Sequence, residues 1–450
     1  MAESKVGTRF SISVALEKGS SADADKREYV VFNDASVHIF NLEMPINHLP
    51  YGSANLVGAP ETTGDPKSGT YGKLIFTGLG TDNKTIEYPI YVYSAVRKQV
   101  SQEVTALDIS FEFGTEVVQN IMEALAFDGT SVEAANKLFS TVGIELRDTV
   151  SPTKKPNSIS DNMTWRFVDG DLSAHMQNVI EHSSIPGDIL YWVFDDELNT
   201  YKLGTFNISK GTKKKNFFMY TNDSVTQTSA ASHKLKDSET YVWYYMGYMP
   251  TDLSGANREA RSPNMIIDST SSGSSKDTGI CSNECWRSIL GTMGASDEYM
   301  ENSAYGKQYV IKPFPSNTHK TYAIAPFVRN YLLAEYSKMV KVHIYNHPGP
   351  AVGSCVYFYA ASAKLKTGDF LPDENYTARY IVVGKRIVKD ATVETGMLGK
   401  ERTENTSNLV TEITMVTNNG YAGMLSPDYK AVATLADSVT QSLKKEAKQK

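Results

Sequence analysis

The sequence predicts a β-rich α+β fold, with two similar small antiparallel β-barrel domains, an α+β module between them, a long insertion and a C-terminal helix. Apolar and polar residues alternate through most of the first 114 residues and again near the C-terminus, as in half-buried strands. Between these blocks, apolar residues recur every three or four positions, as in helices. The 450 residues also exceed what one hydrophobic core usually holds. We therefore predict domains at 1–114, at 115–207, at 208–250 together with 341–425, at 251–340, and at 426–450.

The first block contains five alternating stretches separated by turns rich in Gly, Pro, Asp and Asn. These stretches predict strands at 9–17, 28–44, 72–80, 85–98 and 105–114. The segment 47–70 is rich in Gly, Pro and Thr, which predicts an exposed loop.

The α+β module begins where the period changes. We predict helices at 115–127 and at 130–146, with Thr115 as the N-cap of the first and Gly143 ending the second. A short strand and a helix follow at 163–183, with the inward helix positions Leu172, Met176, Val179 and Ile180. The segment 187–206 predicts a hairpin whose turn is the run DDELN.

The second block predicts strands at 215–223 and 239–249, and then a Ser/Gly/Asn-rich insertion at 251–322. A helix is predicted at 325–340, with one apolar side formed by Phe327, Tyr331, Leu332, Tyr336 and Met339. Three closing strands follow at 348–361, 378–390 and 407–420. In the second of these, alternation places Tyr380, Val382 and Gly384 on one face, and Ile381, Val383 and Lys385 on the other. From Ser426 onward the pattern is that of an amphipathic helix, and the two strand-rich blocks are candidates for remote copies of each other.

The composition of the chain argues against several classes of function and location. The 45 basic and 51 acidic residues give a net charge of −6, so bulk electrostatics do not favour nucleic-acid binding. The chain contains no run of about 18 apolar residues and no apolar leader, which predicts residence in a cytoplasm without a membrane anchor. The three cysteines Cys281, Cys285 and Cys355 do not form a disulfide framework.

Candidate chemistry is sparse. Cys281 and Cys285 are half of a metal site at most, and His175 with His182 are interpreted as surface or interface histidines. The spacing of His343 and His347 suits metal ligation on a helix but not in a strand. We interpret Asp195, Asp196 and Glu197 as solvated acids at a hairpin tip, and Lys213, Lys214 and Lys215 as a solvated strand edge. Because no catalytic or phosphate-binding motif is present, we predict that the protein is not an enzyme and uses no cofactor.

An aromatic stripe at 241–249 has two interpretations. Tyr241, Trp243 and Tyr245 share one face, where they could stack on carbohydrate or on bases. The more economical interpretation is a strand buried by its own core and by a neighbouring subunit.

The closing strands VGSCVYFY, ARYIVVGKRIV and LVTEITMVTNNG resemble the closing barrel of phage tail baseplate hub proteins, the late-control D-type proteins and the N-terminal part of the VgrG spike. The segments 115–146 and 164–206 resemble the module between the two barrels of that family. Ser354 and Cys355 stand where the family has a carboxylate. The matching positions are Gly353, Tyr380, Ile381, Val382, Val383, Leu409, Thr411, Ile413, Met415 and Gly420.

The resemblance implies a structural hub: a homotrimer of pseudo-sixfold symmetry that adapts a hexameric tail tube to a trimeric central spike and helps to form a channel for DNA. The implied partners are the chain itself, the tail tube and central spike proteins, and the baseplate wedge and tape-measure proteins, with DNA only in transit. The implied location is the virion, after assembly in the host cytoplasm. The alternatives are a carbohydrate-binding host-recognition module and a cell-wall hydrolase. The predicted subunit or partner contacts are Tyr241, Trp243, Tyr245, Tyr380, Val382, Val432, Leu435 and Val439.

Overall fold

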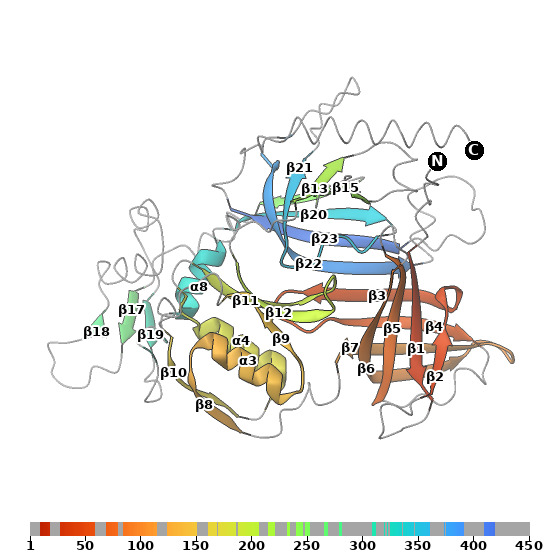
Figure 1. The fold of residues 1–450 in the computed structure, drawn as a ribbon, viewed down its shortest axis with the longest axis horizontal. Helices are drawn as coiled ribbons and strands as arrows, with labels where there is room; N and C mark the ends of the chain where they lie inside the picture. The colour runs from red at the N-terminus through yellow and green to blue at the C-terminus, as the bar shows by residue number, and fades with distance from the viewer. Residues whose placement is uncertain are drawn as a thin grey trace.

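The computed structural model has a β-rich α+β fold, as predicted, with one curved 15-stranded sheet in two halves and a smaller α+β module packed against it (Figure 1). It describes residues 10–18, 28–58, 69–79, 84–114, 124–150, 161–168, 170–185, 188–206, 215–220, 232–234, 240–245, 248–252, 265–268, 279–280, 308–311, 319, 322, 325–334, 336–345, 347–360, 373, 375–390 and 409–418. The predicted C-terminal helix at 426–450 lies outside these residues.

The first half of the fold is antiparallel throughout, with the strand order β2-β1-β5-β6-β7-β4-β3. The prediction at 28–44 covers two strands, because a single 3-10 turn, η2 (Asp34–Ser36), interrupts it. The strands are β1 (Ser11–Glu17), β2 (Tyr29–Phe32), β3 (Val37–Pro45), β4 (Tyr51–Gly58), β5 (Thr70–Leu79), β6 (Lys84–Gln99) and β7 (Thr105–Phe113).

The prediction of a loop at 47–70 is wrong for its first part, where β4 runs between β3 and β7. Two of the three inward positions of β4 carry little or no side chain, and this obscured the alternation: Ala54 is buried and Gly52 has no side chain, while only Leu56 is large. A methyl group on Gly52 would meet the backbone oxygen of Asn41 and the ring of Phe111. The turn chemistry of this segment therefore reflects close packing inside the sheet rather than exposure.

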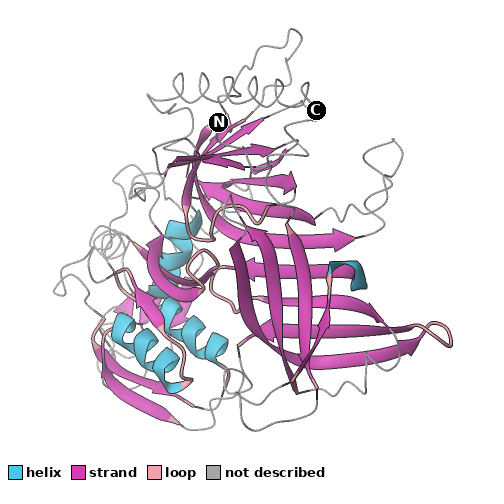
Figure 2. Ribbon diagram, turned by 45° about the vertical axis from the view of Figure 1, so that its right-hand side comes forward, coloured by secondary structure: helices cyan, strands magenta, loops and turns pink. Residues whose placement is uncertain are grey.

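The α+β module contains β8 (Leu125–Gly129), α3 (Ser131–Thr141), β9 (Leu146–Asp148), β10 (Met163–Phe167), α4 (Leu172–His182), β11 (Ile189–Asp195) and β12 (Thr200–Phe206). Thr130 and Glu133 form a capping box at the start of α3, and Gly143 has a φ of +73° just beyond its end, as its prediction as a helix stop requires. The four predicted inward side chains of α4 are buried, and the predicted hairpin is β11–β12. Figure 2 shows α3 and α4 side by side between the strands of this module.

The predicted helix at 115–127 is wrong in its last residues. Leu125–Phe127 belong to β8, which pairs with β10 so that Phe127 lies opposite Trp165. Tertiary pairing with β10 outweighs the helical spacing of this short apolar run. Residues 115–123, with the predicted N-cap Thr115, lie outside the described part of the chain.

The second half is a mixed sheet, in which β13 runs parallel to β15 and β21, rather than the antiparallel barrel predicted. The predicted strand at 239–249 is divided between β15 and β16. The three closing strands are confirmed as β21, β22 and β23. The strands are β13 (Lys215–Tyr220), β14 (Ser232–Lys234), β15 (Thr240–Tyr245), β16 (Tyr248–Asp252), β20 (Lys338–Tyr345), β21 (Cys355–Tyr359), β22 (Ala378–Asp390) and β23 (Leu409–Thr417).

The helix predicted at 325–340 is shorter than expected. It is α8 (Ala325–Ala334), and Met339 lies instead in β20. From Lys338 onward the period is two, with Val340, Val342 and Ile344 buried. Within the insertion, the structure describes a small sheet of β17 (Met265–Asp268), β18 (Gly279–Ile280) and β19 (Gln308–Ile311).

The two halves share one strand path. In the second half the order is β15-β13-β21-β22-β23-β20-β16, and each strand corresponds in chain order to one strand of β2-β1-β5-β6-β7-β4-β3. The longest strand of each half also carries a bulge at the corresponding place, between Val92 and Ser94 in β6 and between Val382 and Gly384 in β22. β14 is an addition, and the reversed direction of β13 is a difference. The prediction that the two blocks are copies is thus confirmed at the level of topology.

One strand pair joins the two halves within the chain. The last part of β22, from Gly384 to Asp390, pairs antiparallel with β3. The strands β20, β23, β22, β3, β4 and β7 therefore form one continuous row (Figure 1). The module packs against this row from one side.

A clasp at Asn47 fixes the module to the first half. The Asn47 N–H donates to the Trp192 carbonyl at 2.8 Å, and the Asn47 side-chain oxygen accepts from the Trp192 N–H at 3.0 Å. Asn47 has a φ of +60°, a conformation that Asn tolerates better than other side chains.

Replacing Asn47 by Ala should lower the free energy of unfolding by about 2–3 kcal/mol, because it leaves the Trp192 N–H without its acceptor and strains the backbone. Asn47→Asp, which keeps the acceptor, is the matched control and should lose less. Urea denaturation followed by tryptophan fluorescence would measure both. An Asn47→Ala protein as stable as the Asp variant would contradict the clasp.

Candidate assembly surface

The strands on both sides of the β22–β3 pair, which we call the junction, have one face that is buried and apolar. Side chains that point from β20, β23, β22 and β3 toward the core are almost completely buried: Val340, Val342, Ile413, Met415, Val382, Ile387, Leu42 and Met44. This face packs against the rest of the chain and needs no partner to cover it.

The opposite face of the same row is polar, and its charges are paired across the strands. Arg386 contacts Glu43 at 3.0 Å and also donates to the Asn41 side chain at 2.8 Å. Glu412 accepts from Lys341 at 3.1 Å and from His343 at 3.2 Å. A pocket of about 280 Å³ opens on this face and is lined by Glu43, Pro45, Lys341, Val383, Gly384, Lys385, Arg386, Glu412 and Thr414.

The pKa values of the two carboxyl groups on this face, Glu412 and Glu43, are shifted in opposite directions. Burial works to raise the pKa of Glu412, but the hydrogen bonds from His343 and Lys341 outweigh it, so the pKa lies below its usual value. Partial burial raises the pKa of Glu43 despite the neighbouring Arg386. These pairs lie on a partly exposed sheet face, where ion pairs fix orientation more than they add stability.

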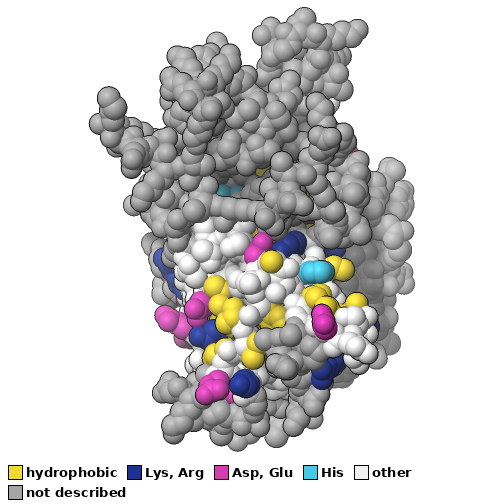
Figure 3. All heavy atoms as spheres, turned by 90° about the vertical axis from the view of Figure 1, so that its right-hand side faces the viewer, with side chains coloured by type: hydrophobic (Ala, Val, Ile, Leu, Met, Phe, Trp, Pro, Cys, Tyr) yellow, Lys and Arg dark blue, Asp and Glu magenta, His cyan; other side chains and the backbone are white. Residues whose placement is uncertain are grey.

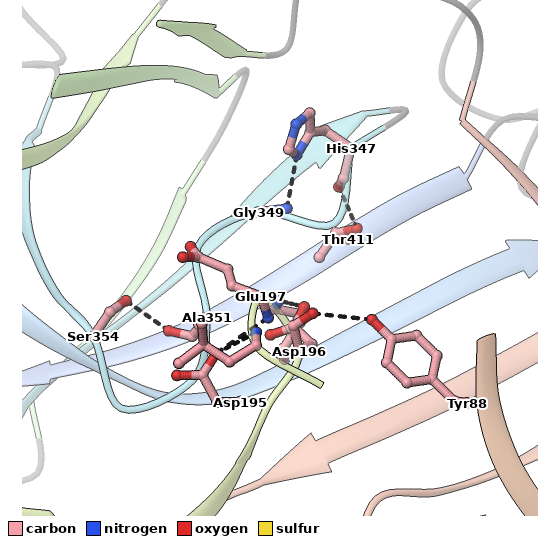
Figure 4. Close-up of polar contacts among 11 residues, drawn as sticks. Tyr88, Asp195, Asp196, Glu197, His347, Gly349, Ala351, Ser354 and Thr411 are labelled. Carbon is pink, nitrogen blue, oxygen red and sulfur yellow. Dashed lines mark hydrogen bonds and ion pairs between the residues drawn. The ribbon is translucent and has the colours of Figure 1, made fainter. Parts of the chain in front are cut away.

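A buried ion pair lies beneath the junction. Lys385 Nζ contacts Asp196 Oδ2 at 2.5 Å, with the lysine side chain fully buried and the aspartate side chain 7% exposed. The Tyr88 hydroxyl donates to the Asp196 carbonyl at 3.1 Å (Figure 4). The first half, the second half and the module therefore meet at one point, through β6, β22 and the β11–β12 turn.

The interpretation of Asp195 and Asp196 as solvated acids is wrong, since both are buried at the hairpin tip. Asp195 Oδ1 accepts from the N–H groups of Glu197 and Leu198 and so shapes the turn (Figure 4). Burial raises the pKa of Asp196, while Lys385 works against that rise. The hairpin tip is covered by both halves of the large sheet, through Tyr88 and Lys385, which the local sequence does not reveal.

The loop between β20 and β21 is fixed by hydrogen bonds within the loop and from β23. His347 Nδ1 accepts from the Gly349 N–H at 3.0 Å, and Thr411 donates to the His347 carbonyl at 2.7 Å (Figure 4). Burial, with a contribution from the positive Lys385, lowers the pKa of His347 to about 3. Gly353 has a φ of +83°, and a methyl group there would lie 2.7 Å from the Tyr191 hydroxyl oxygen. A glycine is needed at this position for both reasons.

The predicted contact residues are placed as follows. Tyr245, Tyr380 and Val382 are fully buried within this chain, so their apolar character is explained without a partner. The Tyr245 hydroxyl donates to the Tyr359 carbonyl at 2.6 Å, so this ring is not available for stacking on a ligand. Only the backbone of Tyr241 and Trp243 is described, in β15. Outside the described residues lie Val432, Leu435 and Val439.

Of the two histidines predicted at a surface or an interface, His175 is buried within the chain, 7% exposed and packed on Phe167, so it is not at the surface. His182 is half-buried and stacks on Tyr322 with ring centroids 3.8 Å apart. Burial lowers the pKa of His182. Among the described residues, no three His, Cys, Asp or Glu side chains gather in a way that could hold a metal ion.

The remaining predicted groups add no site. Cys355 is a buried free thiol whose pKa is raised by burial. Lys215 begins β13. Cys281, Cys285, Lys213 and Lys214 fall outside the described residues. In the described part of the chain, no helix is both long and apolar enough to cross a membrane.

Sequence reasoning missed Lys385, Arg386 and Glu43 as the residues of the junction. The bulge between Val382 and Gly384 reverses the alternation, so Lys385 points inward rather than sharing a face with Ile381 and Val383. A glycine in the middle of a long strand was the one available signal for such a bulge.

Figure 3 shows the side of the molecule at the right of Figure 1, where the described side chains mix hydrophobic groups with charges of both signs. Such a surface is typical of contacts between subunits as well as of ordinary exposed sheet.

No protein-family model matches the chain, and no curated protein matches it. Solved structures similar to it include a tail protein from Neisseria meningitidis (10% identity, 92% of this chain and 98% of that chain, TM-score 0.47) and the 43 kDa tail protein of prophage MuSo2 from Shewanella oneidensis (10%, 90% and 98%, TM-score 0.47). The Francisella PdpA–VgrG complex is also similar (8% identity, 94% of this chain and 54% of that chain, TM-score 0.46).

Proposed function

We propose that the protein is the structural hub of a phage tail baseplate, acting as a homotrimer of pseudo-sixfold symmetry. The observation that carries this proposal is the shared strand path of the two halves, joined within the chain by β22 and β3. Three chains with two equivalent halves each present six similar units, which fits a sixfold tube on one side and a threefold spike on the other. The resemblance of the closing strands to tail hubs supports the same role.

The junction row supports a channel wall. Its dry face is already covered by the chain, and its polar face, with Arg386, Glu43 and Glu412, remains in water. In a closed ring, such a sheet lines the lumen with its polar face. DNA passes through this lumen in transit, and the paired charges leave no strong positive surface that would hold it.

The proposed partners are the tail tube protein and the central spike protein, with the baseplate wedge and tape-measure proteins as further neighbours. The proposed location is the virion, after assembly in the host cytoplasm. The role is structural rather than catalytic.

The test is the absolute mass in solution by light scattering, for the full chain alone and co-expressed with its candidate spike protein. We expect a mass of three chains of 49.7 kDa each, with or without added spike. A single chain in both settings would remove the ring and with it the proposed function. Denaturing and rerunning the trimer gives the single-chain reference on the same column.

A further inference from the structure

We infer that copies of this chain join by antiparallel pairing of the last part of β6 in one copy with β16 in the next. This inference rests on the proposed function and names the surfaces that close the ring. The occupant of each edge is a second copy of this chain.

The first step is the equivalence of β6 and β22. The early part of β22 pairs with β21, and its later part, beyond the bulge, pairs with β3. The early part of β6 pairs with β5 up to Val92, and its later part, beyond the corresponding bulge, continues from Ser94 to Gln99 with β7 on one side. On the other side of this later part, the structure describes no strand. It is the place that β3 occupies beside β22.

The second step is the equivalence of β3 and β16. Each is the last strand of its half, next to β4 and β20 respectively. β3 uses its other edge to bind β22, whereas β16 pairs only with β20 among the described strands. Each chain therefore contains one complete junction, the pair β22–β3. It also contains the two strands of a second junction, β6 and β16, which lie apart within the chain and can pair only between two copies.

The third step gives the register. Equivalent rows run Val92–Phe111–Gly52–Leu42 in the first half and Val382–Met415–Val340–Pro250 in the second. At the filled junction, Arg386 lies four residues after Val382 and faces Glu43, the residue after Leu42. The same offsets place Val96 opposite Thr251, and Lys98 opposite Met249.

The side chains at these two edges favour burial. Val96 is 51% exposed, Val100 66% and Met249 48%, and Tyr93 is 44% exposed at the bulge of β6. Large apolar side chains at a strand edge invite pairing with another chain unless something covers them. Pro250 donates no backbone hydrogen bond, so the pairing relies on its neighbours Met249 and Thr251.

Disulfide cross-linking tests the register. The full chain carries Val96→Cys and Thr251→Cys, with Cys281→Ser and Cys285→Ser, and is oxidised at its assembly concentration. Two matched pairs accompany it in the same background. Glu43→Cys with Arg386→Cys reproduces the filled junction and should close within one chain, while Val96→Cys with Leu198→Cys, also 50% exposed, measures chance collision.

We expect covalent dimers and trimers from the Val96/Thr251 pair, in an amount about tenfold or more above that of the Val96/Leu198 pair. A trimeric mass without this excess, when the Glu43/Arg386 pair closes, would overturn the inferred pairing and leave the proposed function standing. A monomeric mass without cross-links would overturn both.

Discussion

Replacing Lys385 by Met should lower the free energy of unfolding by about 3–5 kcal/mol at pH 7, because it leaves the Asp196 carboxyl group buried without its counter-charge. Three parts of the chain meet at this pair, so the loss should appear in the main unfolding transition. Urea denaturation followed by circular dichroism at 222 nm would measure it.

The double variant Lys385→Met with Asp196→Leu is the control, because it removes both charges and keeps similar volume. It should recover most of the stability, as replacement of a buried ion pair by apolar groups is often close to neutral. If the double variant is as unstable as Lys385→Met alone, packing rather than the buried charge is responsible. The difference between single and double variants measures the coupling of the pair.

The stability of the wild-type protein should fall by about 2 kcal/mol between pH 7 and pH 5 through His347 alone. Burial lowers the pKa of this imidazole to about 3 in the folded chain, while the unfolded chain has the usual value near 6.5. The folded state therefore binds fewer protons than the unfolded state within that window, and acid favours unfolding. Protonation at Nδ1 would also break the bond from the Gly349 N–H.

His347→Asn keeps an acceptor near the position of Nδ1 and removes the titrating group. Its free energy of unfolding, measured in urea at pH 7, 6 and 5, should depend less steeply on pH than that of the wild type. His182 and His319, whose pKa values are also lowered by burial, are present in both proteins and cancel in the comparison. Parallel pH profiles would rule out His347 as the source.

Hydrophobic periodicity correctly predicted those helices and strands whose buried face is visible as an apolar repeat in their own sequence. α4 and β23 follow their apolar repeats, and β22 has the bounds that alternation predicts. The failures arise where distant contacts decide. In β4, two of the three inward positions are Gly52 and Ala54, so the apolar alternation is weak. Leu125–Phe127 form a strand because β10 lies beside them.

The candidate surface was less predictable than the fold. The pairing of Arg386 with Glu43 depends on a bulge and on two strands far apart in sequence, and neither leaves a periodic signal. The predicted aromatic contacts include Tyr245 and Tyr380, whose rings serve the chain's own core. Apolarity marks burial, but it does not distinguish burial in the chain from burial by a partner.

The pairing of β22 with β3 has a consequence for biosynthesis. Asn41 and its partner Arg386 are 345 residues apart, so the ribosome exposes β3 long before β22 exists. At the usual rates of translation the edge of β3 waits roughly 20–70 s for its partner. During that time the nascent chain carries an open sheet edge that β6 of another nascent chain, the equivalent of β22, is able to occupy. Polysomes that translate this message should therefore depend on chaperones that hold strand edges apart until the C-terminal half emerges.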